Sequence, residues 1–355
     1  MPQTSLPHHH RTGTAERNAM KKEEPKSIAQ KLQTVSEGTI CVERIRSDEN
    51  AGTLFSGQFQ GITSGKGCIE VYDVFPGIEA SFNFFLAPEV KFHHRASESV
   101  LEVYYCRSGR VGWNMRGGTA IYLGAGDAAV HSMACCANSA MMFPLGYAEG
   151  LSVSADLSKL PSVCLEILGE SGVQAGRLQE RFCTGKSSAI PARSDLEHIF
   201  APLFSVDASQ RLPLLKLKVL ELLIHLSSLN PSKRELTQYF SRQTELIKEI
   251  HKQLTTHLEQ RFTIEDLSKQ YLINTSALKE VFKAVYGLPI ATYMKEYRVH
   301  KAMKLLRDTD ASIADIAAQV GYETQGKFSK AFKDVMQVLP TEYRKMQHQK
   351  GLHLQ

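Results

Sequence analysis

The chain of 355 residues has no apolar run that approaches the roughly 20 residues needed to cross a bilayer. Its seven cysteines form no Cys-x-x-Cys pair, are odd in number and all lie before residue 184. This usage indicates free thiols in a reducing cytoplasm, including the vicinal pair Cys135-Cys136. We therefore expect a cytoplasmic protein with no membrane partner.

The first residues contain no apolar core of the signal-peptide type, so we expect no signal peptide among them. We expect residues 1–37 to form a disordered tail and residues 347–355 to form a second, shorter one. His8, His9 and His10 are interpreted as chance composition, with a tag remnant or a metal-binding tract as the alternatives.

A large excess of one charge is absent, since 42 Lys and Arg face 37 Asp and Glu. The surplus of five is confined to residues 246–355, which hold 17 basic and 12 acidic residues. Residues 1–245 carry no net charge and residues 246–355 are basic, which indicates that the last third of the chain binds a polyanion.

Short apolar runs alternate with turn-forming residues between residues 38 and 157, as in "CIEVYDVF", "IEASFNFFLA" and "LEVYYCRSGRVGWNM". Runs of this length predict the strands of a β-sandwich or barrel. Gly109, Gly117 and Gly118 suit hairpin turns that need a positive φ.

Residues 158–230 predict helices, and "RLPLLKLKVLELLIHLSSLN" carries two apolar faces. One face comprises Leu212, Leu215, Val219, Leu222, Leu223 and Leu226, and the other Leu217, Leu220 and Ile224. We expect one face to pack on the sheet and the other on a twin subunit, which makes this a dimerisation segment of a homodimer. The alternative is a helix buried within its own domain. Residues 231–244 follow as a linker that lets the last domain reorient.

The last third contains the same motif twice, as "IEDLSKQYLINTSALKEVFK" from Ile264 and "IADIAAQVGYETQGKFSKAFK" from Ile313. Each copy opens with a capping-box pattern, Thr263-x-x-Asp266 in the first and Ser312-x-x-Asp315 in the second. The spacing predicts a short helix in each copy, from Ile264 to Tyr271 and from Ile313 to Val320.

A tight turn and a second helix follow in both copies. Gly321 suits the bend of the second copy, and the second helices begin at Asn274 or Thr275 and at Thr324. A short helix, a turn and a second helix form the helix-turn-helix pattern. Between the copies, Ile290 to Asp308 reads as one continuous helix of roughly 28 Å. A strut of that length can set two recognition helices into successive major grooves, which lie ~34 Å apart.

Residues 245 to 346, with "IADIAAQVGY", "FSKAFK" and "LPTEYR", resemble the DNA-binding domain of the AraC/XylS family of bacterial transcription regulators. The resemblance implies two helix-turn-helix units on double-stranded DNA, with RNA polymerase as a further partner. It implies base-facing positions at Ser276, Lys279, Glu280, Gln325, Gly326, Ser329 and Lys330. Lys283 and Lys333 match positions near the phosphates. Glu280, Gly326 and Gln337 depart from the family's usual arginine, side-chain-bearing residue and glycine.

The chemistry of these side chains agrees with the resemblance. Gln325 can pair with adenine and Lys330 with guanine, whereas Lys283, Lys327 and Lys333 suit phosphates. Glu280 can accept from cytosine, but a surface pair with Lys279 or Lys283 is the favoured interpretation. We expect Phe282, Phe328 and Phe332 to be core residues.

The stretch "LEVYYCRSGRVGWNMRGGTAIYLGAGDAAVHSM" resembles the small cupin-like β-barrel that many family members carry as a sensory domain. Cupin enzymes hold a metal with His-x-His, a Glu and a later His, whereas this chain has adjacent His93-His94, then Glu98 or Glu102, and His131. Adjacent residues of a strand point to opposite faces, so we expect no metal, no cofactor and no enzyme activity. A cavity lined by Trp113, Tyr104 and Phe84, with either Arg95 or Arg107, suits an aromatic or anionic effector.

The sequence therefore predicts an α+β protein. It comprises an N-terminal cupin-like β-barrel with a helical dimerisation segment (residues 38–157 and 158–230) and a C-terminal all-α double helix-turn-helix domain (residues 245–346). The resemblance to regulators of the pyochelin type implies a siderophore as one candidate effector. The expected function is effector-controlled, sequence-specific DNA binding. The alternatives are a cupin-type enzyme fused to a DNA-targeting domain and an architectural DNA binder without a sensor.

Overall fold

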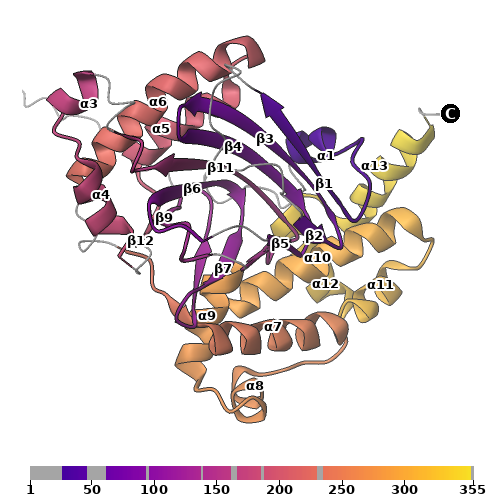
Figure 1. Cartoon of the computed structure of the whole chain (residues 1–355). Helices are drawn as coiled ribbons and strands as arrows, with labels where there is room; N and C mark the ends of the chain where they lie inside the picture. Colours follow the sequence, from indigo (N-terminus) through magenta and orange to yellow (C-terminus); the bar gives the residue numbers. More distant parts are fainter. Residues whose placement is uncertain are drawn as a thin grey trace, which may run out of the picture.

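The computed structural model describes residues 26–45, 61–92, 96–136, 139–160, 166–184, 188–229 and 235–352. The N-terminal domain, residues 26–229, contains two β-sheets with helices against one of them, and the C-terminal domain, from residue 241 onwards, is helical (Figure 1). The chain thus belongs to the α+β class. Across the described residues, no helix combines the length and apolar character required to span a bilayer.

The first sheet has seven strands in the order β1-β3-β4-β11-β6-β9-β12 and is antiparallel except between β1 and β3. Its strands are β1 (Thr39–Ile45), β3 (Lys66–Phe75), β4 (Ile78–Leu86), β11 (Tyr147–Asp156), β6 (Val100–Gly109), β9 (Ala128–Ser132) and β12 (Ser188–Ile190). The second sheet has six strands in the order β13-β8-β7-β10-β5-β2. Its strands are β13 (Tyr239–Phe240), β8 (Thr119–Leu123), β7 (Val111–Met115), β10 (Ala140–Met142), β5 (Glu89–Phe92) and β2 (Gly61–Thr63).

The expected closed barrel is not found among the described strands, because each sheet keeps its own edges. Among the described strands, none of one sheet pairs with a strand of the other, and the edges β2, β12 and β13 are only two or three residues long. The seven-stranded sheet is buried on both faces. Along β6, Leu101, Val103 and Tyr105 face one core, whereas Tyr104 and Cys106 face the other. This alternation follows from the two-residue period of a strand.

Helix α1 (Lys26–Lys31) lies within the range that the sequence analysis expected to be a disordered tail. Ile28 and Leu32 are completely buried and pack against Cys68 of β3. This contact covers part of one face of the seven-stranded sheet.

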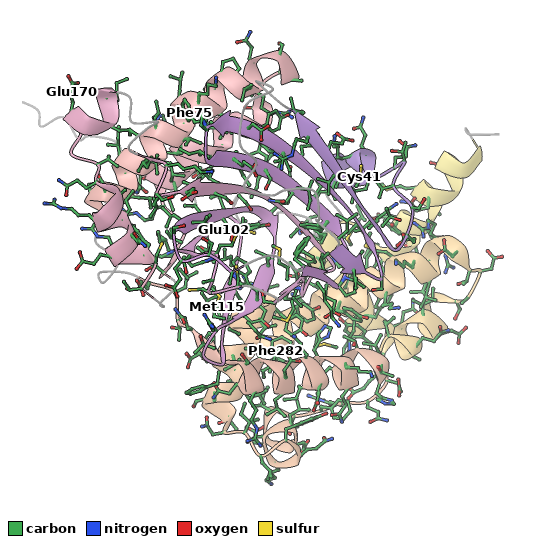
Figure 2. All side chains as sticks on the ribbon, in the orientation of Figure 1. Cys41, Phe75, Glu102, Met115, Glu170 and Phe282 are labelled. Carbon is green, nitrogen blue, oxygen red and sulfur yellow. The ribbon has the colours of Figure 1, made fainter. Side chains whose placement is uncertain are left out.

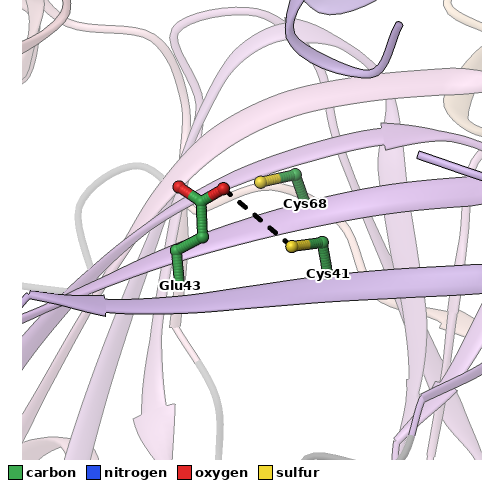
Figure 3. A group of neighbouring side chains, drawn as sticks. All are labelled: Cys41, Glu43 and Cys68. Carbon is green, nitrogen blue, oxygen red and sulfur yellow. Dashed lines mark hydrogen bonds between the residues drawn. The ribbon is translucent and has the colours of Figure 1, made fainter. Parts of the chain in front are cut away.

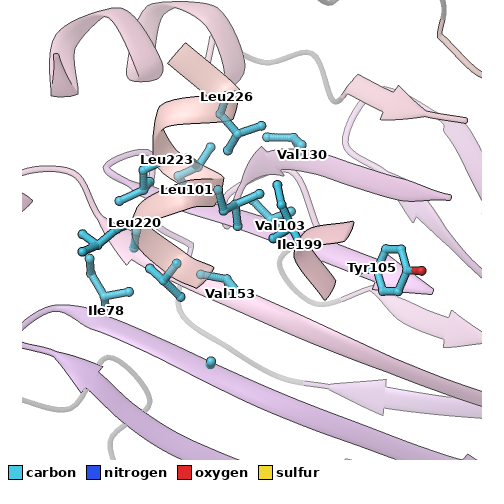
Figure 4. Packing of buried hydrophobic residues seen from close by; sticks show 14 of the residues in the cluster. Ile78, Leu101, Val103, Tyr105, Val130, Val153, Ile199, Leu220, Leu223 and Leu226 are labelled. Carbon is cyan, nitrogen blue, oxygen red and sulfur yellow. The ribbon is translucent and has the colours of Figure 1, made fainter. Parts of the chain in front are cut away.

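Helices α3 (Glu166–Glu170), α4 (Ala175–Phe182), α5 (Ser194–Ser205) and α6 (Ala208–Ser228) cover the outer face of the seven-stranded sheet (Figure 1). Leu223 and Leu226 of α6 pack against strand residues such as Leu101 and Val130 (Figure 4). Leu222 and Leu223 are at most 1% exposed, so both belong to the intradomain core. On the second apolar face, which was expected to pack on a twin subunit, Leu220 is buried within the chain and Leu217 is 65% exposed.

The C-terminal domain contains seven helices in the described residues. These are α7 (Ser241–Thr256), α8 (Ile264–Gln270), α9 (Thr275–Tyr286), α10 (Ile290–Asp308), α11 (Ile313–Gln319), α12 (Gln325–Met336) and α13 (Pro340–Leu352). Helix α10 has the bounds predicted for the strut. It separates two small cores, one built around Phe282 and the other around Phe328 and Phe332. Each helix-turn-helix therefore has its own apolar support.

The expected linker is not a free tether where it is described. Tyr239 and Phe240 form β13, which pairs with Ala120 and Thr119 of β8 and so extends the six-stranded sheet. Ala120, Tyr122 and Met142 of the N-terminal domain also share a core with α7 and α9. The two domains are therefore packed together through a continuous apolar contact.

Candidate nucleic-acid interface and cavity

Both copies have the predicted N-cap, but the complete capping box forms only in the first. The hydroxyl of Thr263 accepts from the backbone N–H of Asp266 at 3.1 Å, and the Asp266 carboxylate accepts from the backbone N–H of Thr263 at 3.2 Å. In the second copy the hydroxyl of Ser312 accepts from the N–H of Asp315 at 3.1 Å. Asn274 caps α9, and these side chains satisfy N–H groups that a helix start leaves without partners. Thr324 caps α12 in the same way.

The turn between the two helices needs a left-handed residue in both copies. Gly321 has φ 82° in the second copy, and Leu272 has φ 52° at the matching position of the first. A Cβ on Gly321 would lie 1.9 Å from the carbonyl oxygen of Leu258, so only glycine fits there. Leu272 is 94% exposed and has room for its side chain despite the strained backbone. Gln337, with φ 61°, ends α12 where glycine is usual.

The predicted DNA-contacting residues lie on the outer faces of α9 and α12. Eight of them are exposed and Ser329 is half-buried. The exposed residues are Ser276, Lys279, Glu280 and Lys283 on α9, and Gln325, Lys327, Lys330 and Lys333 on α12. Phe282, Phe328 and Phe332 are fully buried on the opposite faces, as predicted. The helices thus present a polar, mainly basic face and anchor it by phenylalanines.

Two of these residues have partners within the chain. Lys327 forms an ion pair with Glu323, one turn earlier. Glu280 accepts a hydrogen bond from the hydroxyl of Tyr239 at 3.2 Å. The favoured expectation of a surface pair with Lys279 or Lys283 was therefore wrong, because β13 brings a phenol closer. Sequence spacing along one helix could not reveal a partner from another segment.

Arg110 joins the N-terminal domain to the end of α9. It lies between β6 and β7, and its guanidinium donates to the carbonyl of Val285 at 3.0 Å and to that of Ala284. The last carbonyls of a helix lack partners within it and carry partial negative charge, so a buried cation satisfies them well. Burial lowers the pKa of Arg110, an effect that the nearby Asp127 carboxylate opposes. No local sequence signal marked this contact.

A small cavity lies between the two sheets and has a volume of about 70 Å³. It is lined by Ile69, Ser81, Asn83, Phe92, Glu102, Tyr104, Trp113, His131, Met133, Cys136, Ser139, Met141 and Ser152. Tyr104 and Trp113 are thus on the cavity that the sequence analysis expected, with ring centroids 5.5 Å apart. Arg95, His93 and His94 lie outside the described residues.

Two other residues considered for that lining lie elsewhere. Arg107 pairs with Glu149 at 2.9 Å and stacks over Phe204 of α5. Phe84 packs against the cores that contain α1 and the outer helices. Instead, Glu102, His131 and Cys136 bring polar and sulfur-containing groups to the cavity.

Two polar atoms on the cavity wall lack a hydrogen-bond partner in the described part of the chain. They are the hydroxyl of Tyr104 and Nε2 of His131, both of which are buried. Gly150 permits the position of Tyr104, because a Cβ there would lie 2.5 Å from the phenol oxygen. Burial raises the pKa of Tyr104 well above its usual value, so the hydroxyl remains a donor. Buried polar groups without partners are uncommon and point to a missing ligand or water.

Two capped helix-turn-helix units on one helical strut, with basic residues outward, are the arrangement of a double helix-turn-helix domain. Residues 267–346 match the family described as "Helix-turn-helix domain". The HTH-type transcriptional activator RhaR of Mannheimia succiniciproducens is 34% identical over 91 residues, which are 26% of this chain and 33% of that protein. Over its last third, the chain is therefore similar to HTH-type transcription regulators.

Further relatives match the same region. The melibiose operon regulatory protein of Escherichia coli is 29% identical over 97 residues, 27% of this chain and 32% of its own length. The chain therefore matches about a third of both curated relatives. Among solved structures, the C-terminal domain of AraT from Geobacillus stearothermophilus is 31% identical, with a TM-score of 0.29, over 30% of this chain and 88% of that chain.

Proposed function

We propose that this protein is a sequence-specific transcription regulator that places α9 and α12 in adjacent major grooves of double-stranded DNA. The observation that supports it most is the exposure of the basic and amide side chains on both second helices, above separate buried cores. Action on a promoter implies RNA polymerase as a further partner. The relatives are named as transcription regulators, which favours this function over an enzyme fused to a DNA-targeting domain.

Substitution of two lysines on α12 tests this proposal. Lys330→Ala is expected to cost ~1–3 kcal/mol on a DNA site selected with the full-length protein and to relax preference at one base pair, because Lys330 reads a base. Lys333→Ala is expected to weaken binding to all sequences alike and to reduce the salt slope by about one, because Lys333 meets a phosphate. Fluorescence anisotropy at several salt concentrations measures both effects.

The matched control is Lys91→Ala, which removes one exposed positive charge from β5 of the N-terminal domain. It is expected to leave affinity and preference unchanged. If Lys330→Ala and Lys333→Ala reduce binding to selected and random DNA equally, the division between base reader and phosphate anchor is wrong.

The N-terminal domain, as a cupin-like sensory domain, binds the effector in the cavity beside Tyr104 and Trp113. Pockets for drug-sized ligands usually measure roughly 300–1,000 Å³, well above the 70 Å³ found here. A siderophore or a bulky aromatic effector would therefore require the two sheets to move apart, whereas a very small ligand would not. We also propose a homodimer, with Leu217 of α6 as the exposed apolar residue that favours this face as the contact.

The effector acts on DNA binding through the contacts that hold α9 to the N-terminal domain. Arg110 binds the C-terminal carbonyls of α9, and Tyr239 binds Glu280 on its outer face. A base-facing residue that is engaged within the chain is less available to DNA, so this arrangement represents the weakly binding state. An effector shifts the balance only if it binds the two states differently.

Arg110→Ala tests this coupling. Loss of the guanidinium frees the end of α9, so the ligand-free protein is expected to bind its selected site more tightly. A gain within roughly 5- to 150-fold corresponds to ordinary allosteric coupling. Tyr239→Phe, which removes only the hydroxyl bonded to Glu280, is expected to act in the same direction.

Arg107→Ala is the control for this experiment, because Arg107 lies on β6 near Arg110 but pairs with Glu149 of the same domain. Its affinity for DNA is expected to equal that of the unaltered protein. Unchanged or weaker binding by both Arg110→Ala and Tyr239→Phe, with normal melting curves, contradicts a restraining role for these contacts.

A further inference from the structure

Three side chains that commonly bind metals meet at the cavity of the N-terminal domain. Glu102 of β6 and His131 of β9 are directly paired in the register of two adjacent strands, and Cys136 follows β9. Sγ of Cys136 lies 3.6 Å from Oε2 of Glu102. One ligand atom from each of the three residues lies within 4.8 Å of the others. Glu102 is found among the strands, inside the N-terminal domain (Figure 2).

The imidazole of His131 is already oriented for a ligand. Its Nδ1 lies 3.0 Å from the carbonyl oxygen of Ser132, which can only accept, so Nδ1 carries the proton. Nδ1 also lies 3.9 Å from Sγ of Cys136, so the ring contacts the thiol through this nitrogen. Nε2 has a free lone pair, is buried and has no hydrogen-bond partner among the described residues. Histidines that bind metals usually donate the other ring N–H to a carbonyl or carboxylate in this way.

The spacing fits a tetrahedral ion. Zinc binds sulfur at ≈ 2.3 Å and carboxylate oxygen at ≈ 2.0–2.2 Å, so a tetrahedral site separates the two ligand atoms by about 3.6 Å. The distance between Cys136 Sγ and Glu102 Oε2 has that value. Thiolate, imidazole and carboxylate together favour zinc and related d-block ions over magnesium or calcium, which prefer oxygen alone.

The cavity has room for an ion and little else. A water molecule needs roughly 10–15 Å³ of such volume, so 70 Å³ accommodates an ion with a few waters. Tyr104 is on the same wall, and its unpartnered hydroxyl can donate to a fourth ligand, such as a metal-bound water or a small anion. The two buried polar atoms without partners are thus explained by one occupant.

We propose that Glu102, His131 and Cys136 bind a divalent d-block ion of the zinc class. This names the ligand class of the effector site and in that respect rests on the function proposed above. The sequence analysis expected no metal, since it considered only His93-His94, Glu98 or Glu102, and His131, and treated Cys136 as a core thiol. The strand register and the turn after β9 bring that thiol to Glu102.

A second trio in the chain provides the comparison. Cys41 and Glu43 of β1 lie beside Cys68 of β3, with Cys41 Sγ 3.9 Å from the Glu43 carboxylate (Figure 3). The ammonium group of Lys31 lies 3.6 Å from Glu43 and is ion-paired with Glu70, so a cation already occupies this neighbourhood. We therefore assign no metal to it, and its two cysteines serve as control thiols.

Cobalt(II) is the probe for this site, because a thiolate bound to it gives a charge-transfer absorption band. The full-length protein carries His8→Ala, His9→Ala and His10→Ala, since a run of histidines would bind cobalt by itself. Titration under reducing conditions without DNA is expected to give the band at one equivalent of Co²⁺, and zinc is expected to displace it. Cys136→Ser is expected to abolish the band. Glu102→Gln is expected to lower the affinity for Co²⁺ by more than the roughly 10- to 100-fold loss that is typical when a residue hydrogen-bonded to a metal ligand is removed.

The control combines Cys41→Ser and Cys68→Ser, which is expected to retain the band in full. Melting curves without metal establish whether each variant is folded. If Cys136→Ser does not fold, the nearly isosteric Glu102→Gln tests the site in its place. The proposal is overturned if the protein with an unaltered cavity gives no band. It is also overturned if the band is lost only in the variant that combines Cys41→Ser and Cys68→Ser. DNA is absent from the titration, so this result is independent of the tests with Lys330 and Lys333.

Discussion

Leu223→Lys is expected to unfold the N-terminal domain. Leu223 is 1% exposed and packs against the seven-stranded sheet, so a lysine there would place an ammonium group in an apolar core. A buried, unpaired charge belongs to the few single changes that cost on the order of 5 kcal/mol, which is comparable to the whole stability of a domain. Loss of the cooperative melting transition and of soluble protein measures the effect.

Leu217→Lys is the matched control, because Leu217 is on the same helix and is 65% exposed. It is expected to leave the melting temperature nearly unchanged. If α6 forms the dimer contact, sedimentation shows a shift to monomer for this variant alone. Because Leu223 is buried within one chain, we do not expect a folded, monomeric Leu223→Lys protein. That result would show that Leu223 lies between subunits.

Gly321→Ala is expected to disrupt the second helix-turn-helix. The new Cβ would approach the carbonyl oxygen of Leu258 to 1.9 Å, and the backbone at φ 82° is already unfavourable for alanine by roughly 1–2 kcal/mol. Together these effects should cost about 3 kcal/mol or more. They should also tilt α11 against α12. We expect a clearly lower melting temperature of the C-terminal domain and loss of binding to the selected DNA site.

Gly326→Ala separates this effect from a general sensitivity to added methyl groups. Gly326 lies in the first turn of α12, and a Cβ added there would have no neighbouring atom within 4 Å, so the methyl group of alanine meets only solvent. Alanine is favoured over glycine in helices by up to ~1 kcal/mol, so stability should stay level or rise. If Gly321→Ala and Gly326→Ala have the same melting temperature, the backbone at Leu258 moves aside with no loss of stability, and the prediction is wrong.

The sequence was sufficient for most elements of the C-terminal domain. The tail expected at residues 347–355 was wrong in part, because α13 continues to Leu352. The capping residues Thr263 and Ser312, the bounds of α10 and the buried phenylalanines all follow from interactions within a few residues of the chain. Such signals are local, because a cap or an apolar stripe depends on spacing along one helix. Their repetition after about fifty residues made the double motif recognisable.

Contacts between distant segments required the tertiary structure. Sequence periodicity showed that α6 is apolar on two sides but could not say whether sheet or partner covers each side, and the structure assigns Leu222 and Leu223 to the sheet. Whether the strands close into a barrel depends on pairing between segments that are far apart in the sequence. In the structure the two sheets keep separate edges and form no closed barrel among the described strands.

The sequence by itself determined that this chain carries two capped helix-turn-helix units on a basic, helical domain, because caps and apolar periods are encoded locally. Only the tertiary structure decided that Arg110 binds the end of α9 and that Cys136 joins Glu102 and His131. Arg110 is 174 or more residues away from its partners. No spacing rule covers such a distance, since the pairing is fixed by how whole sheets and helices pack.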